Sequence, residues 1–346
     1  MRRTCGGPPE RKENAMKNTD NWDLMMSAAK QYYQLGLSQD IIAKNLFISK
    51  STVSRLIKKA VEMGYIEFRI NSFGQADEML QHELLATFGI HCTVLPNLLD
   101  SELVRLNDVC AYAAKDILQH HISDSHIIGI PWGKTIEYLA ANINEPVEQH
   151  PDMKICMVNG FVNGSIRCMR GIHIVEKLSA TLKATGYILP CPLLVESPEV
   201  KATLLSDSSV KEVFDIMLSA DTLIMSVGPF DMHNTYLTEL GQDVVDHLRG
   251  FNGAGNFAGR TFDINGRELP TGLGSRLMSL SIKEVAAKKK RICIAVGEYK
   301  ARAILGLLRG HIINYLYTDS DTARALLSEH KKQFGQSRKA VAEETE

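Results

Sequence analysis

The chain lacks the sequence marks of a membrane-spanning, secreted or metal-binding protein. None of its apolar runs reaches the roughly 18 residues of a membrane helix, and no signal peptide is visible. Its seven cysteines are scattered, without a CxxC pair or the spacing of zinc ligands, and its histidines are equally dispersed. We therefore expect a reduced, cytoplasmic protein that does not enter a membrane and that binds neither a metal nor a cofactor.

An excess of charge of either sign is also missing. The 346 residues carry 39 Lys and Arg against 40 Asp and Glu, a formal net charge of −1. Such a balance gives no general attraction to nucleic acid, so any such affinity must come from a local patch. The window from Lys44 to Lys59 is locally basic. The length allows a second, larger domain beside a small module.

The basic window belongs to the most informative stretch of the chain, LSQDIIAKNLFISKSTVSRL, which runs from Leu37 to Leu56. Two short helical patterns are separated by a tight break, and Ser38 and Ser49 each stand where a helix N-cap is expected. This is the layout of a helix-turn-helix, whose second helix lies in the major groove of DNA. We predict a DNA-binding domain over residues 21–75.

Apolar side chains at helical spacing predict the core of this domain. The inward-facing residues of the two short helices are Ile41, Ile42, Leu46, Val53, Leu56, Ile57 and Ala60, with Phe47 and Ile48 filling the turn. An upstream helix from about Trp22 to Leu35 supplies a third wall. The segment YIEFRI, residues 65–70, alternates like a strand and is expected to form a wing edge.

Small hydroxyl, amide and basic side chains remain outside, near the start of the second helix. Such groups contact phosphates and base edges, so the expected partner is double-stranded operator DNA. The predicted DNA-binding residues are Ser38, Gln39, Ser49, Lys50, Ser51, Thr52, Ser54, Arg55 and Lys58. Two other interpretations stay open: a three-helix domain with an ordinary basic surface, and a helix-turn-helix that serves protein contact.

Both ends of the chain are polar. Residues 1–20 contain Gly and Pro without a clear helical period, so we expect disorder there, and residues 331–346 are expected to form a loose tail. Lys12 and Glu13, shortly before Met16, are residue types that a purine-rich ribosome-binding sequence would encode. This observation motivates the hypothesis that translation begins at Met16. The long segment between, residues 76–330, is expected to form the second domain.

Short apolar runs alternate with helical stretches throughout this second domain. Strands that are apolar along their whole length and separated by helices predict an α/β fold, with a parallel sheet covered on both faces. The expected strands are residues 92–96, 126–130, 154–160, 186–194, 221–228 and 291–297. The expected helices are residues 78–90, 104–120, 135–141, 171–185, 209–219 and 300–309. In such sheets, ligands bind at the carboxyl ends of the strands.

Three loops near those strand ends hold candidate binding residues. In PWGKT, the amides of Gly133, Lys134 and Thr135 at a helix start can hold an anion. In AVGEYK, Lys300 opens a helix, where the macrodipole disfavours a cation, so a bound anion would explain the lysine. The glycine-rich segment NGAGNFAGRTFDINGRE, which contains Asn256, is expected to be a flexible loop that closes over a ligand.

These pieces, in this order, resemble the SorC family of bacterial transcriptional regulators from about Trp22 to Ser328. The motifs that carry the resemblance are YYQLGLSQDIIAKNLFISKSTVSRLIKKAVEMGYIEFRI, GIPWGKT, GNFAGRTFDINGRE and AVGEYKARAILGLLRGHIINYLYTDSDTARALL. The resemblance implies a cytoplasmic regulator, usually a homotetramer. It also implies a C-terminal domain with the Rossmann-like fold of glucosamine-6-phosphate deaminases and ribose-5-phosphate isomerases. That domain would bind a phosphorylated sugar or polyol that alters operator affinity, and family habit favours a repressor of a carbohydrate-utilisation operon.

The resemblance also assigns the effector site to particular residues. They are Gly133, Lys134, Thr135 and Lys300 for the phosphate, and Asn256 for sugar hydroxyls. The family often has an acidic residue at the position of Asn256, which puts its usual sugar in question. It commonly has Gly-Gly where this chain has Val296-Gly297.

A sugar-phosphate isomerase or deaminase fused to a DNA-binding module is the alternative. Catalysis of that kind needs a general base within hydrogen-bond reach of the substrate. The glycine-rich loops contain no paired carboxylates and no His–carboxylate arrangement, and Glu298 is the only nearby candidate. We therefore expect a regulator without catalytic residues.

Overall fold

In the computed structural model, the described residues are 10–66, 76–97, 100–143, 152–162, 168–231 and 241–343. The chain divides into two compact units, residues 1–71 and 72–346, and each is described by itself. The first unit contains the predicted helix-turn-helix, and the second contains the predicted sheet.

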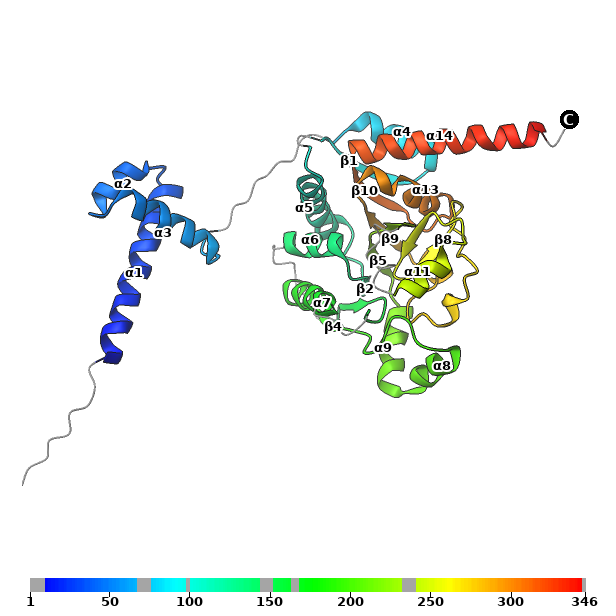
Figure 1. The fold of residues 1–346 in the computed structure, drawn as a ribbon, viewed down its shortest axis with the longest axis horizontal. Helices are drawn as coiled ribbons and strands as arrows, with labels where there is room; N and C mark the ends of the chain where they lie inside the picture. Colours follow the sequence, from blue (N-terminus) through cyan, green and yellow to red (C-terminus); the bar gives the residue numbers. More distant parts are fainter. Residues whose placement is uncertain are drawn as a thin grey trace, which may run out of the picture. The chain divides into compact units, whose positions relative to one another are not determined.

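Three helices form the N-terminal unit: α1 (Glu10–Tyr33), α2 (Gln39–Asn45) and α3 (Lys50–Glu62), drawn in blue in Figure 1. Its core consists of Met25, Ala28, Ala29, Ile42, Val53, Leu56, Ile57 and Ala60. Alanines on α1 and α3 are fully buried, and their small side chains let the two helices pack closely. The inward positions predicted for the second helix of the motif are confirmed.

Ile41 and Phe47 do not lie in the core as predicted. Helix α2 has only seven residues, and Ile42 is its buried side chain, which leaves Ile41 46% exposed. Phe47 adopts a φ of +57°, and it is 94% exposed instead of filling the turn. This left-handed conformation lets the chain reverse between α2 and α3. The predicted wing falls mostly on residues 67–70, which lie outside the described residues.

The ends of the chain are more helical than predicted. Helix α1 begins at Glu10, well before Trp22, and α14 (Ser320–Glu343) runs through most of the polar tail. The expectations of disorder for residues 10–20 and of a loose tail are therefore wrong. Both segments are rich in Glu, Lys, Arg and Ala, which have high helix propensity, so polarity did not distinguish helix from coil.

A parallel sheet of seven strands, in the order β1-β10-β9-β5-β2-β3-β4, forms the centre of the larger unit. The strands are β1 (His91–Leu95), β2 (Ile127–Ile130), β3 (Lys154–Met157), β4 (Thr185–Tyr187), β5 (Thr222–Met225), β9 (Lys290–Ile294) and β10 (Tyr315–Asp319). Successive side chains enter different cores: Ile292 and Ile294 pack on one face of the sheet, and Cys293 packs on the other. Burial on both faces explains why the strands are apolar along their whole length.

Helices cover both faces of this sheet, as Figure 1 shows. One face carries α5 (Glu102–His120), α6 (Lys134–Asn142) and α7 (Cys168–Leu182). The other carries α4 (Glu78–Phe88), α9 (Ser208–Leu218), α13 (Ala301–Arg309) and α14. The predicted α/β architecture is confirmed, but β10, which lies between β1 and β9, was not among the predicted strands. The strand predicted for residues 186–194 ends at Tyr187, shortly before Pro190 and Pro192.

A smaller antiparallel sheet of β6 (Gly228–Pro229), β7 (Gly255–Phe257) and β8 (Arg260–Phe262) packs against α13. The remaining elements are α8 (Pro198–Ser206), α11 (Gln242–Leu248), α12 (Ile282–Ala286) and the 3₁₀ helices η1 (Leu273–Ser275) and η2 (Glu298–Lys300). Asn256, Phe257 and Phe262 are buried in the hairpin of β7 and β8. The expectation that this segment is a flexible closing loop is therefore wrong.

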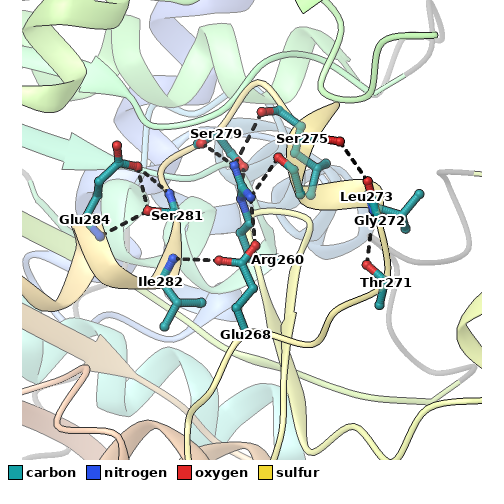
Figure 2. Close-up of polar contacts among 12 residues, drawn as sticks. Arg260, Glu268, Thr271, Gly272, Leu273, Ser275, Ser279, Ser281, Ile282 and Glu284 are labelled. Carbon is teal, nitrogen blue, oxygen red and sulfur yellow. Dashed lines mark hydrogen bonds and ion pairs between the residues drawn. The ribbon is translucent and has the colours of Figure 1, made fainter. Parts of the chain in front are cut away.

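Arg260 joins this hairpin to the segment of residues 268–282 (Figure 2). Its guanidinium donates to the Glu268 carboxylate at 2.7 Å, to the Ser279 hydroxyl and carbonyl at 3.2 and 2.9 Å, and to the carbonyls of Gly274 and Leu277 at 3.0 and 3.4 Å. These contacts use all five N–H donors of the side chain. Arg260 is also buried. Because all five donors are engaged, the side chain has none left for a ligand and acts as a structural clamp.

We expect Arg260→Met to lower the free energy of unfolding by about 3 kcal/mol, because it leaves the partly buried Glu268 carboxylate and several carbonyls without their donor. Arg249, whose exposed guanidinium pairs with Asp246, supplies the matched control Arg249→Met, with an expected loss of about 0.5 kcal/mol. Urea denaturation followed by circular dichroism measures both. Equal midpoints for the two variants would contradict the clamp.

Candidate DNA-binding and effector sites

Serine caps set the start of both helices of the helix-turn-helix. The Ser38 hydroxyl accepts a hydrogen bond from the Ile41 amide at 3.4 Å, and the Ser49 hydroxyl accepts one from the Thr52 amide at 3.1 Å. Ser49 also lies 2.8 Å from the hydroxyls of Ser51 and Thr52. The structure therefore gathers these hydroxyls at the N-terminus of α3, the end that meets base edges in this motif.

The basic side chains of α3 differ in their pairing. Lys50 forms an ion pair with Asp40 at 2.8 Å, and Lys58 lies 3.7 Å from Glu62. Arg55 is exposed, and no described acidic residue pairs with it. An arginine with free donors can form the bidentate contact with guanine that gives base specificity. Arg55 is accordingly the strongest candidate for reading a base.

The other predicted residues of this surface occupy consistent positions. Ser54 is exposed on α3, and Gln39 is half-exposed at the first position of α2. The prediction missed the exposed ring of Phe47, which lies in the turn beside this surface. Its signal in the sequence was a phenylalanine in the break between the two helical patterns. In the structure this residue has a positive φ, where glycine is usual.

The loops after β2, β5 and β9 meet at the carboxyl edge of the parallel sheet. These strands are close neighbours, with β5 between the other two. Helix α6 leaves β2 toward one face of the sheet, and α13 leaves β9 toward the opposite face. A crevice forms where successive helices diverge in this way, and open α/β sheets bind ligands there.

The loop after β2 brings Gly133, Lys134 and Thr135 to this edge, as predicted. Gly133 precedes α6 with a φ of +151°, which favours glycine, and the Lys134 side chain is exposed. Thr135 is buried, and its hydroxyl accepts a hydrogen bond from the Ser226 hydroxyl at 3.2 Å. Ser226, which directly follows β5, was missed by the prediction, although it lies at the end of an expected strand.

The loop after β9 places Lys300 at the same edge, directly before α13. Desolvation by burial is the main cause that lowers the pKa of Lys300. Cys293, Glu102 and Cys110 raise it by smaller amounts, and the positive charge of Lys134 lowers it further. No described carboxylate forms an ion pair with either lysine. Two ammonium groups that repel each other at one edge of the sheet, one of them partly dehydrated, attract an anion.

Asn256 contributes a buried amide from β7. The residue is 2% exposed, and its Nδ2 atom has no hydrogen-bond partner among the described residues. Strand β7 packs against α13, the helix that Lys300 precedes, and β6 contacts η2. A buried amide without a partner is costly, and a ligand hydroxyl would satisfy it. Asp263, by contrast, accepts from the amides of Asn265 and Arg267 and forms an ordinary turn.

The described residues contain no group of three or more His, Cys, Asp or Glu side chains placed to hold a metal ion. Within the same residues, no helix is long and apolar enough to span a membrane.

Known proteins match both units of the chain. The Sugar-bind family, a family of sugar-binding domains, matches residues 75–328, and the winged helix-turn-helix DNA-binding family matches residues 36–67. The sorbitol operon regulator of Klebsiella pneumoniae is 27% identical over 90% of this chain and all of the relative. The deoxyribonucleoside regulator of Bacillus subtilis is 25% identical over 88% of this chain and 97% of the relative.

A solved structure agrees with these matches. The full-length sorbitol operon regulator of Klebsiella pneumoniae aligns with a TM-score of 0.65 and 26% identity, covering 89% of this chain and 99% of that protein. The Sugar-bind match spans well over half of the chain, and the helix-turn-helix match precedes it. The chain therefore belongs to the SorC family of sugar-responsive, DNA-binding transcriptional regulators.

Proposed function

We propose that the protein represses a carbohydrate-utilisation operon, and that a phosphorylated sugar or polyol bound in the larger unit releases it from operator DNA. The observation that carries this proposal is the convergence of the unpaired Lys134 and Lys300 at the carboxyl edge of the sheet. The full-length match to sorbitol, deoxyribonucleoside and erythritol regulators supports the same class of function.

The proposed effector has two chemically different parts. A phosphate would bind the two ammonium groups together with the amides of Gly133, Lys134 and Thr135 at the start of α6. Sugar hydroxyls would bind the free Asn256 amide, which can donate to a hydroxyl oxygen. Asn256 is a neutral amide at a position where the family often has a carboxylate. We therefore expect the effector to present a different arrangement of hydroxyl groups from that of the family's usual sugar.

The proposed assembly is a cytoplasmic homotetramer in which effector binding and DNA binding are linked. A ligand shifts such an equilibrium only by its differential affinity for the two states, about 1–3 kcal/mol per coupled site. The enzyme alternative receives no support from Glu298, which is exposed, and the full-length relatives are regulators of transcription.

A panel of sugar and polyol phosphates tests this proposal by thermal shift, because a ligand that binds only the folded state raises its melting temperature. The stabilising compound should then weaken binding to DNA beside the protein's own gene in a gel-shift assay. Stabilisation only by unphosphorylated sugars, or release of product from a phosphorylated one, would reject the proposed function.

Arg55→Ala should reduce operator affinity by about 1–3 kcal/mol and relax the preference at one base pair, because Arg55 is the unpaired arginine of α3. Lys58→Ala is the matched control. It should weaken all sequences about equally and lower the slope of log affinity against log salt by about 1. Fluorescence anisotropy with operator and scrambled DNA at several salt concentrations measures both. An unchanged base preference in Arg55→Ala would remove Arg55 from base reading.

Lys300→Met should weaken effector binding at least tenfold, about 1.5–3 kcal/mol, while operator affinity without effector stays unchanged. Methionine preserves the packing of the alkyl stem but removes the charge. Lys283→Met on α12 is the control, because Lys283 is exposed on another helix. Isothermal titration calorimetry reports the effector affinity. Wild-type affinity in Lys300→Met would exclude this lysine from the site.

Effector affinity should fall as the pH rises from neutral toward about 10. The protonated ammonium binds the anion, and burial lowers the pKa of Lys300, so this lysine loses its charge at a lower pH than exposed lysines do. A bound anion favours the charged form and raises that pKa again, so binding should take up protons in the alkaline range. Calorimetry in buffers of different ionisation enthalpy measures this uptake. Proton release on binding would contradict the assigned charge state.

A further inference from the structure

A turn of buried polar residues connects the candidate effector loop to the start of the larger unit. Thr318, Asp319, Ser320 and Thr322, at the end of β10 and the start of α14, are each at most 2% exposed. We call this segment the Thr318–Thr322 turn. None of its four polar side chains takes part in the proposed phosphate contacts, so their burial needs another explanation.

One end of the turn holds the loop that follows β9. The Gly297 amide donates to the Thr322 hydroxyl at 2.8 Å, and the Thr318 hydroxyl donates to the Ala295 carbonyl at 2.7 Å. Gly297 has a φ of +115°, and a Cβ atom there would lie 2.4 Å from the Tyr299 ring. Glycine is therefore required, and its freedom lets the peptide before it take more than one orientation.

The other end of the turn reaches Asp77. The Ser320 hydroxyl lies 3.2 Å from both the Asp77 carboxylate and the Leu95 carbonyl. Asp77 is the N-cap of α4: its carboxylate accepts from the Leu80 amide at 3.2 Å, and its own amide donates to the Val94 carbonyl at 2.8 Å. In the sequence, Asp77 closely follows the residues that join the two units.

The turn itself is held by further hydrogen bonds. The Asp319 carboxylate accepts from the Thr322 amide at 2.9 Å and from Arg105 at 2.7 Å, and Arg105 also donates to the Asp100 carbonyl. A continuous set of short contacts therefore runs from Gly297, three residues before Lys300, to the cap of α4. Packed buried networks of this kind shift between discrete arrangements and do not deform gradually.

We propose that the anionic group of the effector and the Thr322 hydroxyl compete for the Gly297 amide, and that this competition carries the effector signal to Asp77. Without effector, the amide is bonded to Thr322 and the turn holds the cap of α4. With effector, the Val296–Gly297 peptide turns toward the anion, and Thr322 loses its donor. The turn then repacks, and the contact between Ser320 and Asp77 changes. This inference rests on the proposed function, because it requires an anion beside Lys300.

Thr322→Val tests the competition, because valine has the shape of threonine without the oxygen that accepts. The buried Gly297 amide then has no partner until an anion binds, so affinity for inorganic phosphate should rise about tenfold. Thr318→Val is the matched control. It is equally buried and bonded to the same loop, but it removes a donor to a carbonyl and should not raise phosphate affinity. Thr322→Ser, which retains the hydroxyl, should behave as wild type.

The full-length protein is titrated with inorganic phosphate by calorimetry, and hydrogen exchange is followed by mass spectrometry. In the wild type, phosphate should change amide protection both at residues 294–299 and at residues 76–82. In Thr322→Val, the change at residues 76–82 should disappear although phosphate binds more tightly. A purely structural role of Thr322 predicts weaker binding instead.

The outcomes separate the two proposals. Failure of the wild type to bind phosphate would overturn the proposed effector site, and the competition with it. If the wild type binds phosphate but Thr322→Val binds it with unchanged or lower affinity, the competition alone is overturned. If Thr322→Val does not fold, the wild-type exchange decides: no change at residues 76–82 on phosphate binding overturns the signal path.

Discussion

The common direction of β2, β5 and β9 is the constraint on which the candidate effector site depends. Parallel strands end at the same edge, so loops that are far apart in the sequence meet there. Helices α6 and α13 then pass to opposite faces, so their first residues both lie at this edge, where the helices diverge. An antiparallel arrangement of the same segments would place Lys134 and Lys300 at opposite ends of the sheet.

A buried cation and a partly buried cation in this domain show how partners distinguish a structural residue from a candidate binding residue. Arg260 is buried with all five donors engaged, so its desolvation is offset inside the protein. Lys300 loses hydration without an ion pair to any described carboxylate, and Lys134 increases the penalty. The Glu102 carboxylate offsets only part of this penalty, so an anionic ligand would stabilise the charged lysine further.

The sequence predicted those features that depend on local pattern. Apolar spacing gave the inner faces of α2 and α3 except for Ile41, and apolar runs gave six of the strands of the main sheet. Residues whose position depends on tertiary contacts were less predictable. The flexibility expected around Asn256 was wrong because Arg260 clamps the hairpin, and its partners, Glu268 and Ser279, have no recognisable spacing. Ser226 and Thr322 could not be assigned, since a hydroxyl becomes informative only when its partner across the sheet is known.

The modest charge of the DNA-binding surface fits the proposed control by a small effector. Lys50 pairs with Asp40 at 2.8 Å, so α3 offers fewer free cations to phosphates than its sequence suggests. Non-specific affinity rises with the number of phosphates that a protein neutralises, and a strongly basic surface would stay on DNA after any small conformational change. When the electrostatic contribution is limited, specific contacts such as that expected of Arg55 make up more of the operator affinity. Under the proposed function, a coupling of about 1–3 kcal/mol is then enough to move the regulator off its site.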